Sequence, residues 1–185
     1  LDKISIPEAD FNSIRIDNEG GVFYADNFHI EHSESGLDDG NLPEIAAGIS
    51  ATNIFTLHSK PNASKVVHVN FEGFNVTGSR WNVDKKETFF MLPYDSDGDS
   101  GSFSSQEIKD MAAIWHRVAE DYAPFDVDIT TEAPPSYGPN VGHILITNIT
   151  DAEGDDIYGG GGGVAYVNVW GASNFEYYQP ALVFY

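Results

Sequence analysis

The chain has 185 residues, of which 41% are hydrophobic and 13% aromatic, enough for one sizeable core with at most a smaller appended segment. Its 9 basic and 29 acidic residues give a formal net charge of −20, so nucleic acid and anionic membrane surfaces would repel it. It has no cysteine, which excludes disulfides, thiolate chemistry and cysteine-based zinc sites, and no apolar run long enough to span a membrane.

The first predicted element is a hairpin. Two short apolar runs, 14–16 and 22–24, flank the turn-forming residues Asn18, Glu19, Gly20 and Gly21. A glycine-containing turn between two apolar runs is typical of antiparallel strands joined by a short loop. We therefore expect two paired strands near the N-terminus.

The stretch 31–41 is rich in serine, glycine and aspartate and predicts a linker. We place the boundary between an N-terminal segment, 1–60, and a second unit, 61–185, shortly after it. The second unit has the pattern of an α/β (α+β) fold: a mixed, twisted sheet with one long helix, whose first strand–helix–strand unit is parallel. The predicted elements are strands at 65–72, 87–92, 125–131, 143–149, 163–170 and 181–185, and a helix at 104–122.

The predicted helix has a clear beginning and end. Ser104 and Glu107 have the S-x-x-E spacing of a capping box, and Pro124 follows the last turn. The next residues alternate, which predicts a strand with one face in solvent. The expected inward side chains are Phe125, Val127 and Ile129, and the expected outward ones are Asp126, Asp128 and Thr130.

A run of alternating carboxylates precedes the helix. Asp95, Asp97 and Asp99 can converge on one point when the loop coils, and oxygen ligands of this kind suit calcium. The run is not an EF-hand, because Ser100 stands at the sixth position, where glycine is required, and Gln106 at the twelfth, where glutamate is required. The alternative is a solvated turn without an ion, since these residue types favour turns.

Five consecutive glycines, 159–163, lack the lysine and hydroxyl residue of a phosphate-binding loop, so nucleotide binding is not expected. One interpretation is a flexible connection. The other is that bare backbone at the start of the next strand lets an extended peptide lie alongside a sheet edge, as an added strand. The candidate substrate-binding residues are Gly163, Val164, Ala165 and Tyr166.

The histidines do not form a catalytic zinc motif, because H-E-x-x-H is absent from the chain. His116 and Glu120 stand four residues apart on the predicted helix, where a surface pair is far commoner than a metal site. His68 falls within a predicted strand and His143 at the start of another, and we expect structural roles for both.

Several blocks between residues 57 and 185 together resemble the front half, pro-region plus upper subdomain, of secreted bacterial zinc metallopeptidases of the zincin type. The most specific block is the run Trp115–Asp128. The other blocks are His58–Pro61 with Ala63 and Ser64, Val66–Gly73, Pro93–Asp99 and Gly162–Tyr166.

In that family, a helix with the H-E-x-x-H motif follows the sheet, with two histidines on zinc and the glutamate acting on the bound water. The resemblance implies that zinc belongs to a part downstream of Tyr185, so no catalytic residue or zinc ligand is assigned within this chain. It also implies that the first segment is a pro-region, that 164–169 lie near the substrate-binding edge strand, and that the aspartate loop holds a structural calcium. Asp26 or His29 of the pro-region is a hypothetical inhibitory zinc ligand.

The expected protein is therefore the N-terminal portion of a secreted, extracellular zinc endopeptidase. Its partners would be a protein or peptide substrate and its own C-terminal catalytic part. The chain begins without a leader, so a signal peptide is expected to be absent or removed, and the apolar strand ending at Tyr185 suggests that the polypeptide continues. The rival hypothesis is a non-enzymatic, calcium-stabilised extracellular binding module, for which the acidity and the aspartate loop would suffice.

Overall fold

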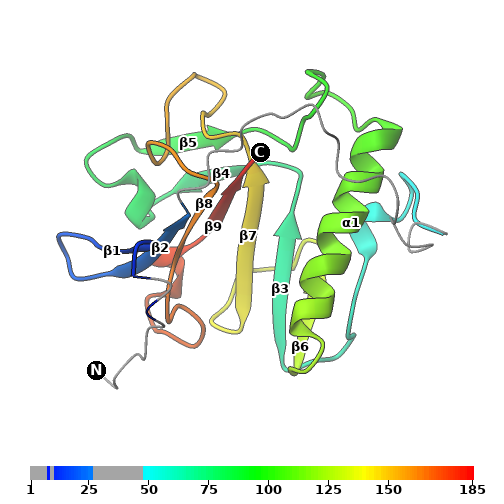
Figure 1. Cartoon of the computed structure of the whole chain (residues 1–185), viewed down its shortest axis with the longest axis horizontal. Coiled ribbons are helices and arrows are strands. Elements are labelled where there is room, and N and C mark those ends of the chain that lie inside the picture. Colours follow the sequence, from blue (N-terminus) through cyan, green and yellow to red (C-terminus); the bar gives the residue numbers. More distant parts are fainter. Residues whose placement is uncertain (1–7, 9–10, 27–47) are drawn as a thin grey trace.

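A seven-stranded sheet is the main element of the computed structural model, which describes residues 8, 11–26 and 48–185 (Figure 1). A two-stranded sheet, one long helix, α1 (Ser105–Tyr122), and three short 3-10 helices, Ile54–Thr56, Arg80–Asn82 and Phe175–Tyr178, complete the regular structure of these residues. The predicted mixed α+β fold with one long helix is confirmed, while the predicted linker at 31–41 and His29 lie outside the described residues. The seven strands in spatial order are β1 (Ile14–Ile16), β2 (Val22–Asp26), β8 (Gly163–Tyr166), β9 (Ala181–Phe184), β7 (Val141–Thr147), β3 (Lys65–Asn70) and β6 (Val127–Thr130).

Parallel and antiparallel pairings divide this sheet into two parts. Strand β3 pairs in parallel with both β6 and β7, and β7 pairs in parallel with β9, which confirms the parallel strand–helix–strand unit. From β9 onward the pairings are antiparallel, through β8 and β2 to β1. The predicted N-terminal hairpin is thus confirmed, and it extends the same sheet that residues 61–185 build.

The beginning of α1 has the expected capping box. The Ser104 hydroxyl accepts a hydrogen bond from the Glu107 amide at 3.3 Å, and the Glu107 carboxylate accepts one from the Ser104 amide at 2.7 Å. Met111 and Ala112 are buried against the sheet, and the Trp115 indole donates to the Ile129 carbonyl at 2.9 Å. The helix is therefore fastened to β6 by apolar packing and by a hydrogen bond.

The two faces of the large sheet bury two separate apolar cores. On one face, Val67 and Ile129 pack under α1. On the other face, Leu145 and Leu182 pack against the small antiparallel sheet of β4 (Phe74–Thr77) and β5 (Thr88–Met91). The described residues thus form three layers, with α1 and the small sheet on opposite sides of the large one. Strand β4 was not predicted.

The prediction that one face of β6 lies in solvent was wrong. All four residues of β6 are buried, including Asp128 at 4% exposure, whereas Phe125 is 58% exposed. Asp128 and its neighbours are covered by segment 54–60, which precedes β3 in the chain and lies along the outer edge of β6. Its amide at Ser59 donates to the Ile129 carbonyl at 3.0 Å, and the His58 ring contacts the Asp128 carboxylate at 2.7 Å.

Candidate functional site

Strand β8, expected to be an open edge for a peptide, is paired on both sides. Gly163 and Val164 pair with β9. On the other side, β2 runs antiparallel to β8 over four residue pairs, with Tyr24 opposite Ala165 and Phe23 opposite Tyr166. The N-terminal hairpin therefore occupies the edge position that an added peptide strand would take.

Two glycines permit this close approach of backbones. Gly161 has φ +106°, and a Cβ there would collide with the Asp26 carbonyl oxygen. A Cβ on Gly163 would lie 3.0 Å from the Leu182 carbonyl oxygen. The Gly162 amide donates to the Asp26 carbonyl at 3.0 Å, and its carbonyl accepts from Phe184 at 2.9 Å. The glycine run is thus a packed junction between β2 and β9.

The side chains of β8 point to opposite faces of the sheet. Val164 is buried in the core beside the small sheet, and the Tyr166 ring packs against Trp81 at 4.8 Å between centroids. Ala165 faces the other way, into a groove of about 480 Å³. All four predicted substrate-binding residues are therefore neighbours on one short strand between β2 and β9.

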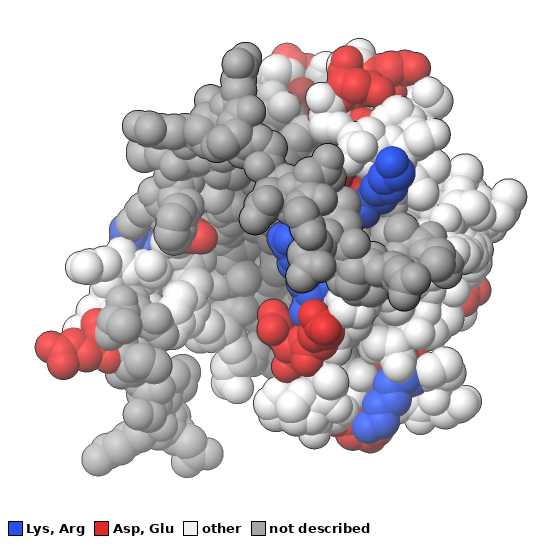
Figure 2. Space-filling view, turned by 45° about the vertical axis from the view of Figure 1, so that its right-hand side comes forward, with Lys and Arg blue, Asp and Glu red and all other residues white. Residues whose placement is uncertain are grey.

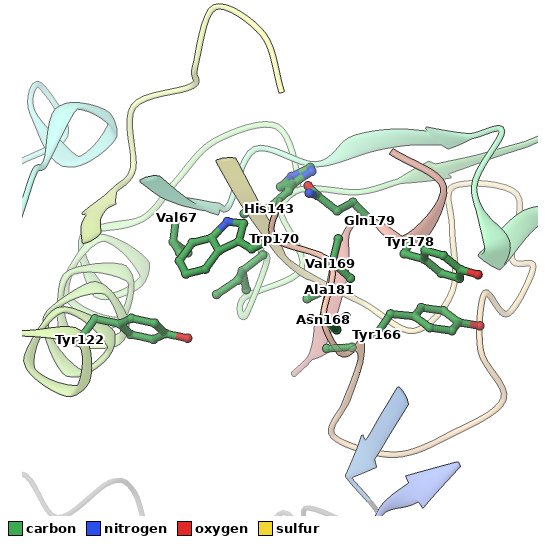
Figure 3. Close-up of a pocket in the computed structure, with 13 residues that line it drawn as sticks. Val67, Tyr122, His143, Tyr166, Asn168, Val169, Trp170, Tyr178, Gln179 and Ala181 are labelled. Atoms are coloured by element: carbon green, nitrogen blue, oxygen red, sulfur yellow. The ribbon is translucent and has the colours of Figure 1, made fainter. Parts of the chain in front are cut away.

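The groove lies beside α1, on the part of the sheet that the helix does not cover. Figure 3 shows Tyr122 of α1 on one side, Tyr166 and Tyr178 on the other, and Trp170 between them. Its floor includes Ile144 and Ala181, and the Trp170 indole nitrogen is buried without a hydrogen-bond acceptor. Sequence reasoning missed this groove because its walls come from five separate stretches of the chain.

The aspartate loop forms a different group of carboxylates from the expected one. Oxygens of Asp95, Asp97 and Glu107 lie within 4.8 Å of one another, a grouping that suits a hard cation, but nothing in it distinguishes calcium from another such ion. Asp99 is not in this group, because its carboxylate accepts from the Gly101 amide at 3.2 Å and the Ser102 hydroxyl at 2.9 Å. The structure thus brings together two of the three predicted residues and adds Glu107.

Glu107 has two roles at the same time. It is fully buried, and its two oxygens accept from the amides of Ser96 and Ser104, each at 2.7 Å. Burial alone would raise its pKa, but the hydrogen bonds from Ser96 and Ser104 outweigh burial and hold the pKa below its ordinary value. The side chain is therefore ionised at neutral pH, caps α1 and faces the loop.

A second acidic group, not predicted from the sequence, surrounds a lysine. The Lys86 ammonium lies 2.8 Å from Asp151, 2.7 Å from Glu153 and 2.6 Å from Asp155. The hydrogen bonds that Lys86 donates to these carboxylates, that to Asp151 first, raise the pKa of Lys86. On the face shown in Figure 2, acidic side chains likewise gather in small groups, some of them against basic ones. The alternation of carboxylates at 151, 153 and 155 was the available sequence signal.

His68 and His143 are buried on the sheet face opposite α1. Their ring centroids are 5.7 Å apart; His68 Nδ1 lies 2.8 Å from the Tyr137 hydroxyl, and His143 Nε2 lies 3.1 Å from the Asn70 amide nitrogen. Burial lowers the pKa of His68 to about 4 and that of His143 to about 3. Both are neutral at pH 7.

His116 and Glu120 form the expected pair along α1, with 3.4 Å between Nδ1 and the carboxylate.

No helix among the described residues is long and apolar enough to cross a membrane. Comparison of the chain with protein-family models, with curated proteins and with solved structures found no match.

Proposed function

We propose that this chain is the N-terminal portion of a secreted zinc-dependent endopeptidase of the zincin type, and that β8 binds the peptide substrate as an antiparallel strand. The observation that carries this proposal is the pairing of β2 with β8. A segment of the chain itself occupies the edge in an extended conformation, with Tyr24 opposite Ala165. Strand addition of this kind supplies affinity through the main chain and leaves side-chain pockets to supply specificity.

The groove beside α1 supports the part of the proposal in which a zinc-bearing helix completes the enzyme. It is lined mainly by apolar and aromatic side chains, among them Val169 and Trp170, and it borders Ala165 of the same β8. A downstream helix packed there would complete the layer that α1 begins, and would lie next to the peptide-binding strand. The zinc and the general base would come from that helix, so residues 1–185 alone would be inactive.

Casein hydrolysis tests this proposal. Purified 1–185 is expected to leave casein intact. The longer polypeptide encoded by the same gene is expected to cleave casein, and a zinc chelator is expected to abolish the cleavage. A gene without an H-E-x-x-H motif downstream of residue 185, or chelator-sensitive cleavage by 1–185 itself, contradicts the proposal.

A second candidate function rests on the group formed by Asp95, Asp97 and Glu107. An ion held there would stabilise an extracellular binding module that performs no chemistry. In that case the β8 edge and the groove would serve binding only. The casein experiment separates the two functions, because a binding module has no hydrolysis for a chelator to abolish.

A further inference from the structure

The turn of the N-terminal hairpin (β1, the turn and β2, residues 14–26) is held by a largely covered arginine from the second unit. The Arg80 side chain is 11% exposed, and its Nε donates to an Asp17 carboxylate oxygen at 2.9 Å. Its Nη2 donates to the Asn18 side chain, and its Nε lies 4.0 Å from the Glu19 carboxylate. Arg80 is positioned by a short 3-10 helix, Arg80–Asn82, which begins with a capping box.

Two tyrosines from the second unit complete the contact. The Tyr166 hydroxyl donates to the same Asp17 oxygen at 2.9 Å, and the Tyr177 hydroxyl donates to Glu19 at 3.1 Å. Burial acts to raise the pKa of Asp17, but hydrogen bonds, first from Tyr166 and also from Arg80, hold the pKa below its ordinary value. The side-chain donors to Asp17 Oδ2 come from the second unit, whereas Asp17 Oδ1 accepts from the hairpin's own amides of Glu19 at 2.9 Å and Gly21 at 2.7 Å.

This arrangement behaves as a receptor for a carboxylate. A buried guanidinium that loses its anionic partner is strongly destabilising, because a desolvated charge is left without compensation. Arg80, Tyr166 and the hairpin turn also line a common cavity of about 360 Å³. If the hairpin left the edge of β8, Arg80 and Tyr166 would require another carboxylate in the place of Asp17.

The receptor is continuous with the peptide-binding edge. Tyr166 belongs to β8 and pairs with Phe23 of β2, so the same residue takes part in both contacts. At Gly21, just before β2 begins, an added Cβ would lie 2.7 Å from the Asp17 Oδ2 atom and 2.9 Å from the Tyr166 ring. A side chain at this point of a strand along β8 would therefore enter the space that the Asp17 carboxylate fills.

We infer that Arg80, Tyr166 and Tyr177 form a subsite for an acidic side chain of the peptide that pairs with β8. The inference rests on the proposed function and adds a substrate class: extended peptides with Asp or Glu at the position of Gly21, two residues before the first residue that pairs with β8. The hairpin occupies this subsite through Asp17 in the structure. Arg80 would then be the residue that determines specificity for the acidic side chain.

Moving the carboxylate within the chain tests the subsite directly. Asp17→Ser keeps an oxygen for the turn amides but removes the carboxylate, and should lower Tm by roughly 10 °C. Adding Gly21→Asp to this variant should restore at least half of the loss, because the backbone at Gly21 lies outside the left-handed region and its side chain points at the vacated space. Adding Gly21→Asn is the matched control and should restore none.

The same Gly21 substitutions in the protein that retains Asp17 give a second Tm comparison, which does not require the Asp17→Ser variant to fold. With Asp17 present, Gly21→Asp should lower Tm more than Gly21→Asn, since two carboxylates would compete for Arg80. Gly21→Asp should therefore have the higher Tm of the two Gly21 variants when Asp17 is replaced by serine, and the lower Tm when Asp17 is retained. Equal Tm values for the aspartate and asparagine variants in both backgrounds would overturn the carboxylate subsite.

Peptide hydrolysis by the longer polypeptide tests the substrate class. A single Asp moved along an otherwise neutral peptide, against an Asn set, should raise kcat/KM roughly tenfold at one position, and Arg80→Gln should remove that preference. Cleavage of both sets at equal rates overturns the inference and leaves the proposed function standing. If neither peptide set is cleaved, the proposed function is overturned. The Tm values of the Asp17 and Gly21 variants then test the carboxylate subsite alone.

Discussion

His68 on β3 and His143 on β7 lie directly opposite each other on neighbouring parallel strands, with their ring planes 16° apart. Tyr137 stacks on the His143 ring at 4.4 Å, and Phe74 meets the same ring edge-on at 4.7 Å. Both imidazoles are therefore buried and packed against aromatic rings. Neither ring can be protonated inside this cluster without a substantial free-energy cost.

This pair should make the protein less stable in mild acid. The pKa of each histidine is 6.5 when unfolded, about 4 for folded His68 and about 3 for folded His143. Between pH 6.5 and 4 the unfolded chain binds more protons, so stability is complete above pH 6.5 and falls as the pH falls. Each histidine should contribute up to about 1.4 kcal/mol per pH unit to the free energy of unfolding.

Urea unfolding at several pH values measures this slope, and His143→Gln supplies the comparison because glutamine can still accept a hydrogen bond from Asn70. The variant should lose the contribution of one histidine to the slope below pH 6.5. An identical slope in the two proteins would show that His143 is protonated without cost in the folded state.

His58 should have the opposite pH dependence. Burial acts to lower its pKa, but the hydrogen bonds to Asp128 at 2.7 Å and Glu132 at 2.8 Å outweigh burial and raise the pKa above 6.5. Its contribution to stability is therefore complete below pH 6.5 and is lost as the pH rises through the folded pKa. His58→Gln should destabilise the protein more at pH 5.5 than at pH 8.5, as measured by urea unfolding. A larger loss at the higher pH would contradict this assignment.

Local patterns were enough to predict most of the regular structure. The hairpin follows from two apolar runs around a turn, and α1 begins where Ser104 and Glu107 predict, because both depend on residues close in sequence. Strand β7 begins at Val141, two residues before the predicted start, and β8 ends at Tyr166, before the predicted end at 170. Strand ends depend on pairing with distant neighbours, which a single sequence does not specify.

The site was less predictable because long-range contacts build it. Asp128 alternates like a solvent-facing residue, but His58, 70 positions earlier, covers it. Arg80 and Asp17 are 63 positions apart and no local pattern joins them. Glu107 was recognised as a cap, whereas its place beside Asp95 depends on how the loop folds back onto the helix.

Ion binding by the aspartate loop can be tested with three substitutions that each remove one carboxylate. If a cation binds Asp95, Asp97 and Glu107, calcium at about 100 times Kd should add about 2.7 kcal/mol to the free energy of unfolding, or roughly 5–10 °C to Tm. Asp95→Asn or Asp97→Asn should remove this shift. Asp99→Asn, with the same change of charge in the same loop, should retain it.

Thermal unfolding in calcium and in a calcium chelator gives the measurement. Equal Tm values for the unsubstituted protein in both solutions would exclude an ion site in this loop. A shift lost equally in all three variants would instead indicate that calcium responds to the overall negative charge of the loop.

Lys86 should be replaceable in part by a divalent cation. Its ammonium lies within 2.8 Å of Asp151, Glu153 and Asp155, and the Asp151 side chain is fully buried, so Lys86→Gln leaves three crowded carboxylates without a counter-charge. The variant should melt well below the unsubstituted protein, because a buried carboxylate that loses its cationic partner is destabilising. Millimolar calcium should recover part of the loss, since the oxygens lie close enough to share an ion.

Lys109→Gln is the matched control for this variant. Lys109 is exposed on α1, so its substitution makes the same change in net charge without touching the acidic group. Calcium should therefore raise the Tm of Lys86→Gln more than that of Lys109→Gln. If both variants melt together and respond alike, the three carboxylates are stabilised by solvent rather than by Lys86, and the short distances to its ammonium contribute nothing to the stability of the fold.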